Sequence, residues 1–93
     1  MTLLRSESVP IVEEQDIVRA RQITRDWAID FGFKLIDQTK MVTAVSELAR
    51  NTLVYGKGGI MLLEALERDF RKGLRAKFED KGPGIPDIEQ ALT

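Results

Sequence analysis

The sequence contains no cysteine and no histidine. Without cysteine, a disulfide framework and thiolate chemistry are excluded, and the composition suits the reducing cytoplasm, where we expect this protein. Without histidine, the commonest general base and the commonest transition-metal ligand are missing. Acid–base chemistry would therefore fall to a carboxylate, a lysine or the single tyrosine, Tyr55.

Long apolar runs and an excess of one charge are also missing. No apolar stretch approaches the roughly 20 residues that a membrane helix needs, and the polar start of the chain does not resemble a signal peptide. The 14 basic and 15 acidic side chains give a net charge of -1, so we expect neither nucleic acid nor a membrane as partner. The 93 residues, 43% of them hydrophobic, suit one compact domain covering residues 1–93.

Two segments have the apolar periodicity of amphipathic helices. In residues 16–31 apolar side chains recur at every third or fourth position, and they place Trp27 in the core. Gly32 suits the end of this helix because glycine adopts a left-handed backbone without steric cost. A second helix is expected from Asp37, as its N-cap, to about Val54.

The strand predictions are less uniform. Residues 6–12 surround a proline and predict an edge strand at best. Residues 74–79 alternate between apolar and charged side chains, which predicts a half-buried strand, and residues 71–73 predict a turn before it. Residues 60–70 fit either a helix or a strand with two apolar faces, and the pattern alone favours a helix. If both segments are strands, they form a hairpin from which Asp80 emerges.

Glu47 and Asn51 are the first candidate pair. On a helix they differ by only about 40° and lie one turn apart on one stripe. An asparagine carbonyl oxygen can be a ligand of Mg²⁺, and a glutamate one turn earlier can orient or deprotonate a hydroxyl group or water. The alternative, favoured on spacing alone, is that both residues belong to the solvated face of an amphipathic helix.

The second candidate is the segment from Asp80 to Pro86. Gly82 and Gly84 allow a ligand to approach the backbone closely, and an ionised Asp80 can accept a hydrogen bond from an exocyclic amine such as that of adenine. The alternative is a strand-to-helix turn whose glycines serve only its geometry. Walker and Rossmann signatures are absent, and residues 56–59 fit both a phosphate-contacting turn and a simple helix end.

Taken together, Glu47-Leu-Ala-Arg-Asn51 and Asp80-x-Gly82-x-Gly84 resemble the N box and the first glycine box of the GHKL ATPase superfamily. The order and separation of the two motifs make this a moderately specific signal. The longer segments DIVRARQITRDWAIDFGF, DQTKMVTAVSELARN and EDKGPGIPDIEQAL resemble the anti-sigma-factor serine kinases, and among them the switch kinases of the bacterial stressosome. The resemblance extends from about Val9 to Thr93.

The resemblance implies a Bergerat fold, an α+β two-layer sandwich with helices on one face of a mixed β-sheet. It replaces the helix favoured above for residues 60–67 with a strand. Glu47 would be the general base that activates the acceptor serine, and Asn51 would coordinate Mg²⁺ at the ATP phosphates. Asp80 would bind the adenine amino group, and Gly82 and Gly84 would shape the floor of the pocket.

The activity implied is that of a cytoplasmic serine/threonine protein kinase that uses ATP and Mg²⁺. Such a kinase phosphorylates a STAS-domain antagonist, associates with the stressosome scaffold and, when released, activates a PP2C-type phosphatase in a stress-response pathway. Two alternatives stay open. One is a non-catalytic module that sequesters STAS-domain or phosphatase partners, and the other is a GHKL ATPase without protein-kinase activity.

The end of the sequence departs from the family pattern. The family continues into an ATP lid, a second glycine-rich box, and a last helix and strand, none of which occurs before Thr93. We therefore expect the 93 residues to be the N-terminal portion of a GHKL domain. We also expect this form alone to have little kinase activity, since the lid is the part that closes over the phosphates.

Overall fold

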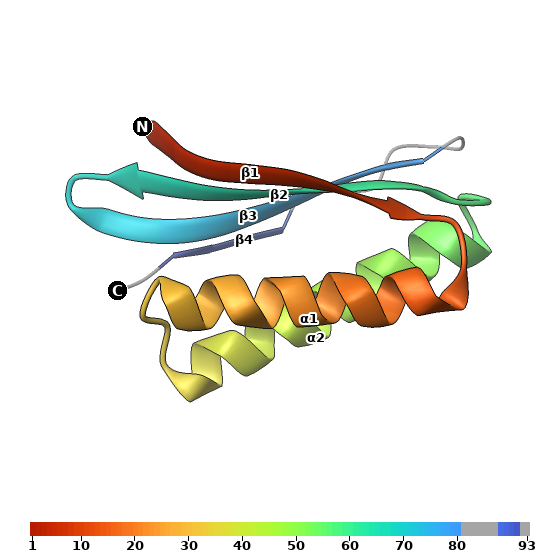
Figure 1. Cartoon of the computed structure of the whole chain (residues 1–93), viewed down its shortest axis with the longest axis horizontal. Coiled ribbons are helices and arrows are strands. Elements are labelled where there is room, and N and C mark those ends of the chain that lie inside the picture. Colours follow the sequence, from red (N-terminus) through yellow and green to blue (C-terminus); the bar gives the residue numbers. More distant parts are fainter. Residues whose placement is uncertain (81–87, 92–93) are drawn as a thin grey trace.

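The computed structural model describes residues 1–80 and, as backbone only, residues 88–91. The chain folds into two layers, with two helices packed on one face of a four-stranded sheet of order β1-β2-β3-β4 (Figure 1). The elements in chain order are β1 (Thr2–Ile11), α1 (Glu14–Asp30), α2 (Leu35–Val54), β2 (Gly59–Arg68), β3 (Arg71–Asp80) and β4 (Ile88–Ala91). The predicted α+β two-layer architecture is confirmed.

The sheet is antiparallel at each of its three described pairings, so the expected mixed sheet is wrong for this part of the chain. The reason lies in the connections. Helices α1 and α2 run in opposite directions beneath the sheet and return the chain to the end of β1, where Ile11 pairs with Gly59. Strand β2 must then run back along β1, and a tight turn reverses the chain again into β3.

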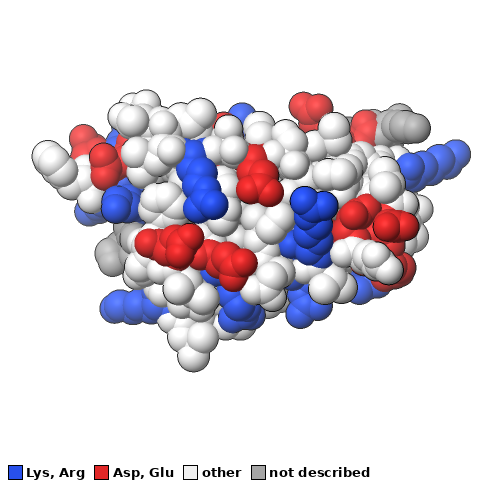
Figure 2. Space-filling view, in the orientation of Figure 1, with Lys and Arg blue, Asp and Glu red and all other residues white. Residues whose placement is uncertain are grey.

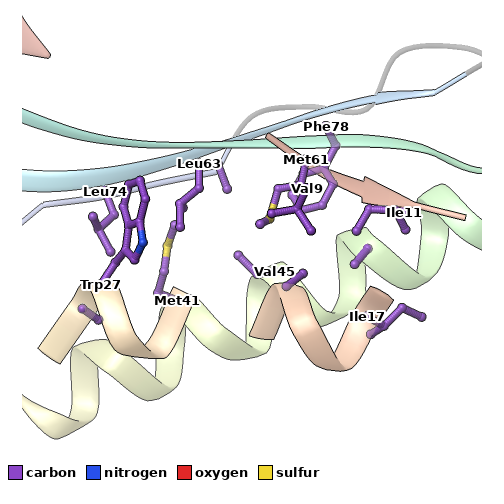
Figure 3. Close-up of a cluster of buried hydrophobic side chains, with 14 of the residues drawn as sticks. Val9, Ile11, Ile17, Trp27, Met41, Val45, Met61, Leu63, Leu74 and Phe78 are labelled. Carbon is purple, nitrogen blue, oxygen red and sulfur yellow. The ribbon is translucent and has the colours of Figure 1, made fainter. Parts of the chain in front are cut away.

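One hydrophobic core fills the space between the helices and the sheet. Trp27 of α1 and Met41 of α2 are 2% and 1% exposed, and both point toward Leu63 and Leu74 of the sheet (Figure 3). Val45, farther along α2, also points into this core and is fully buried. The prediction that Trp27 belongs to the core is confirmed.

The helix boundaries confirm one prediction and correct another. Gly32 follows α1 with φ +80°, and the next amide, of Phe33, donates to the carbonyl of Ala28 at 2.8 Å. This is the left-handed helix end that the glycine predicted. The prediction of Asp37 as N-cap is wrong, because the N-cap is Lys34 and Asp37 lies in the first turn of α2. There its negative carboxylate interacts favourably with the positive N-terminal end of the helix dipole.

The predicted β2–β3 hairpin is confirmed, and so is the strand that the resemblance implied for residues 60–67. The helix that the pattern alone favoured for residues 60–70 is wrong, because β2 lies between β1 and β3 and buries apolar side chains on both of its faces. The turn is not at residues 71–73, which belong to β3. It is formed by Asp69 and Phe70, at φ +51° and +65°, so left-handed non-glycine residues close the hairpin.

Strand β1 lies at the edge of the sheet, as predicted for the segment with the proline. The alternation in β3 is confirmed, with Leu74 and Phe78 buried toward the helices. The opposite face of the sheet carries an ion pair. The carboxylate of Glu64, 11% exposed, lies 2.9 Å from Nε of Arg75 and 3.7 Å from Nζ of Lys77.

The surface is mixed in charge. In the space-filling view, basic and acidic side chains are interspersed over the visible face, without a broad area of one sign (Figure 2). Neither helix in the described part of the chain is both long and apolar enough to cross a membrane.

Candidate functional site

Glu47 and Asn51 lie on the second half of α2 with exposed side chains. The helix buries its other side, represented by Val45, Ala49 and Thr52, against the sheet and α1. Because α2 is continuous through both candidates, they share one stripe of the helix, as the spacing predicted. Their exposure leaves both side chains accessible to a ligand.

Asn51 also organises the end of the helix through its backbone. Its carbonyl oxygen accepts hydrogen bonds from the amides of Tyr55 at 2.9 Å and Gly56 at 3.1 Å. The chain then turns through left-handed residues at Lys57 and Gly58, with φ +58° and +95°. This turn leads directly into β2.

Asp80 is the last residue of β3 and pairs with Gly59, the first residue of β2. Its side chain lies against Gly56, where an added Cβ would overlap the Asp80 carboxylate. A Cβ on Gly59 would overlap the carbonyl oxygen of Glu79. The two glycines therefore allow the end of α2 and the end of β3 to meet at one end of the molecule (Figure 1).

The structure thus brings Asn51 and Asp80 to the same end of the fold, with Gly56 as the contact between helix and strand. Glu47 lies one helical turn before Asn51. The other two candidates, Gly82 and Gly84, lie outside the described residues. From the sequence, Gly56 fitted both a phosphate-contacting turn and a simple helix end. Its contact with Asp80 could not be foreseen, because it depends on the pairing of Gly59 with Asp80.

A groove along the exposed side of α2 was not predicted. It has a volume of about 750 Å³ and ends at Glu47. Its lining residues are Leu35, Ile36, Thr39, Lys40, Thr43, Ala44 and Glu47. Leu35 and Ile36 are 70% and 63% exposed, and they were missed because the helix was expected to begin after them. The Glu47 carboxylate therefore borders an open, largely apolar groove.

The donor set limits how a metal ion could bind. Among residues 1–80 and the backbone of 88–91, no group of three or more acidic, histidine or cysteine side chains is arranged as a metal site. An Mg²⁺ ion here would take most of its ligands from phosphate oxygens and water, which is usual for magnesium at nucleotides. A single asparagine oxygen on an exposed helix face fits that role.

Comparisons with known proteins give one clear similarity. No family model matches the chain, and no solved structure matches it. The serine/threonine-protein kinase RsbT of Bacillus subtilis (strain 168) is 48% identical over 85 residues. The match covers 90% of this chain and 63% of RsbT. The sequence is therefore closely similar to a serine/threonine-protein kinase along most of its own length, and it spans less than two thirds of that kinase.

Proposed function

We propose that this chain is the nucleotide-binding part of a serine/threonine protein kinase of the GHKL superfamily that acts by partner switching. The observation that carries the proposal is the 48% identity to RsbT over 90% of the chain. The geometry supports it. Glu47 and Asn51 lie on the exposed face of α2, Asp80 lies at the end of β3, and the ends of these two elements meet at Gly56.

Each residue has a role that its chemistry allows. When bound, ATP with Mg²⁺ supplies the phosphoryl group and the charge neutralisation on which phosphoryl transfer mainly depends. Glu47 accepts the proton of the acceptor hydroxyl, and its exposed position leaves room for a protein substrate. The Asn51 side-chain oxygen serves as one ligand of the metal. The Asp80 carboxylate accepts a hydrogen bond from the adenine amine, and Gly82 and Gly84 shape the pocket floor.

The partners proposed are those of a cytoplasmic switch kinase. The substrate is a STAS-domain antagonist that is phosphorylated on serine or threonine, and the kinase also associates with a stressosome scaffold. The second partner is a PP2C-type phosphatase, which the released kinase activates by contact. These assignments rest on the resemblance in sequence.

The pocket is tested first by calorimetric titration of the chain with ADP and Mg²⁺. We expect Asp80→Asn to weaken binding at least about tenfold, because an amide replaces the acceptor that adenine requires. The matched control is Asp26→Asn, an exposed carboxylate on α1 that hydrogen-bonds only to Gln22 of its own helix among the described contacts. Equal affinities in the two variants would contradict the adenine role of Asp80.

The chemistry is tested by transfer of radiolabel from ATP to a purified STAS-domain protein, where we expect the 93 residues alone to give only a small signal. We expect Glu47→Ala to abolish that signal and to preserve binding of the STAS-domain protein, while Glu14→Ala, on the exposed start of α1, changes neither. Loss of transfer and binding together would favour a module that only binds partners. Release of free phosphate without protein labelling would favour an ATPase without kinase activity.

A further inference from the structure

The turn between β2 and β3 carries an aromatic side chain where the backbone disfavours one. Asp69 and Phe70 form a two-residue turn between the paired Arg68 and Arg71, with φ +51° and +65°. Turns of this kind favour Asn-Gly, because both residues have positive φ and a bulky side chain there is a clear outlier. Phe70 is 99% exposed, so no contact within the described part of this chain compensates for its conformation.

Basic residues flank this phenylalanine along the chain, with Arg68 before the turn and Arg71 and Lys72 after it. A hollow of about 550 Å³ lies beside the turn, and three basic residues but only one acidic residue line it. The lining residues are Met1, Leu66, Arg68, Asp69, Arg71, Lys72 and Gly73. The ammonium group of Lys72 lies 5.7 Å from the ring centroid of Phe31, which holds it over the end of α1. The excess of positive charge is local, since the whole chain has a net charge of -1.

This end of the molecule is far from the candidate nucleotide site. The turn precedes Arg71 and the site lies at Asp80, the two ends of a strand of 10 residues, which corresponds to about 30 Å. Figure 1 shows the turn and the end of β3 at opposite ends of the sheet. A protein bound at the turn would therefore leave the nucleotide end accessible.

We propose that the hairpin tip, residues 68–72, is a docking site for a partner protein through an acidic segment that also carries an apolar side chain. Arg68 already lies 4.0 Å from the Asp69 carboxylate, so Arg71 and Lys72 supply most of the positive charge that attracts carboxylates and orients the approach. Phe70 on the turn, together with Met1 and Leu66 in the lining of the hollow, provides the apolar contact that anchors such interfaces. Nucleic acid fits less well, because it requires a broad basic surface, whereas charges of both signs are interspersed on the visible face (Figure 2).

The test uses a short synthetic peptide in which Asp and Glu flank a Leu pair, titrated into the isotope-labelled chain and followed by amide NMR shifts. We expect the shifts to centre on residues 68–73 and to weaken with salt. An isosteric peptide of Asn and Gln should bind about tenfold more weakly. Phe70→Gly should also weaken binding about tenfold, and the variant should fold because glycine suits the backbone of the turn.

Two matched controls distinguish binding at the hairpin tip from the effect of changing a charge or an apolar side chain elsewhere on the surface. Arg71→Glu should abolish binding, whereas Arg21→Glu, the same charge change on the exposed face of α1, should weaken it less than twofold. Val18→Ser removes another exposed apolar side chain, 62% exposed, and should have no effect. Equal effects of the two arginine variants, or shifts centred elsewhere, would overturn the proposal. So would tighter binding of a single-stranded oligonucleotide that does not depend on Phe70. None of these outcomes depends on kinase activity.

Discussion

The Gly56→Ala substitution isolates the contact that joins the two halves of the candidate site. In the structure, a Cβ at Gly56 would overlap the carboxylate and Cβ of Asp80. Rotation about χ1 can move the Asp80 carboxylate, but the Asp80 Cβ, 2.6 Å from the added Cβ, is fixed by its backbone, so the end of α2 or of β3 must also shift. The variant therefore moves the proposed adenine acceptor without removing any functional group.

The expected magnitude follows from the hydrogen bond that is lost. A hydrogen bond to a charged acceptor contributes about 1.5–3 kcal/mol, and each 1.4 kcal/mol corresponds to about tenfold in affinity. We therefore expect Gly56→Ala to weaken ADP binding about tenfold to 100-fold, close to the effect of Asp80→Asn. The free energy of unfolding should also fall, by about 2–3 kcal/mol, because another rotamer cannot relieve the overlap with the Asp80 Cβ and the backbone must shift.

The assay is calorimetric titration with ADP and Mg²⁺, together with urea unfolding of each variant. Gly32→Ala is the matched control, since a Cβ there meets no atom within 4 Å but the residue has φ +80°. We expect this control to lose about 1 kcal/mol of stability and to keep its affinity for ADP. It therefore shows whether a loss of stability alone can weaken binding.

Two results would refute this reasoning. If Gly56→Ala binds ADP as tightly as the unchanged chain while Asp80→Asn does not, the Asp80 carboxylate does not depend on the space at Gly56. If both variants bind normally, Asp80 is not the adenine acceptor. In a double-mutant cycle, the effects of the two substitutions should not be additive, because both act on one hydrogen bond.

Three further predictions concern stability and are measured by urea unfolding. Gly59→Ala should cost about 3 kcal/mol or more, because its Cβ would strike the carbonyl oxygen of Glu79 and the adjoining backbone, which cannot rotate away; an unchanged midpoint would show that the β2–β3 pairing is looser there. Glu64→Gln should cost about 2 kcal/mol by weakening the charged hydrogen bond to Arg75, 2.9 Å long, and a smaller loss in an Arg75→Met background would identify that pair as the cause. Phe70→Gly should stabilise the chain by about 1 kcal/mol, since it relieves the left-handed backbone and loses no buried contact; a loss of stability would mean that the ring supports the fold.

Much of the fold follows from periodicity. The two helices and the half-buried β3 were predictable because each has a single buried face and therefore a simple repeat, whereas the edge position of β1 followed from its proline. The helix that the pattern favoured for residues 60–70 was wrong because this segment is buried on both faces and therefore has no simple repeat. Strand β2 is central and buries Met61 and Leu63 toward the helices and Leu66 on the other face, so its sequence has no alternation to read.

The candidate site was also predictable only in part. The shared stripe of Glu47 and Asn51 depends only on helix geometry, so the sequence was sufficient to predict it. The approach of Asp80 to the end of α2 could not be predicted, because it depends on the register between β2 and β3. The turn position is a further example. Gly73 suggested a turn at residues 71–73, yet the reversal occurs at Asp69 and Phe70, and a bulky residue such as phenylalanine seldom adopts positive φ.

The amino-acid sequence was sufficient to predict the two helices and the α+β class, and to reveal the close resemblance to a serine/threonine-protein kinase. These depend on composition, local periodicity and the identity of the residues along the chain. Three features became visible only in the three-dimensional structure: the antiparallel pairing of the described sheet, the space that Gly56 leaves for the Asp80 carboxylate, and the exposed phenylalanine at the tip of the hairpin. These features depend on strand register and on contacts between distant segments, which no local pattern specifies.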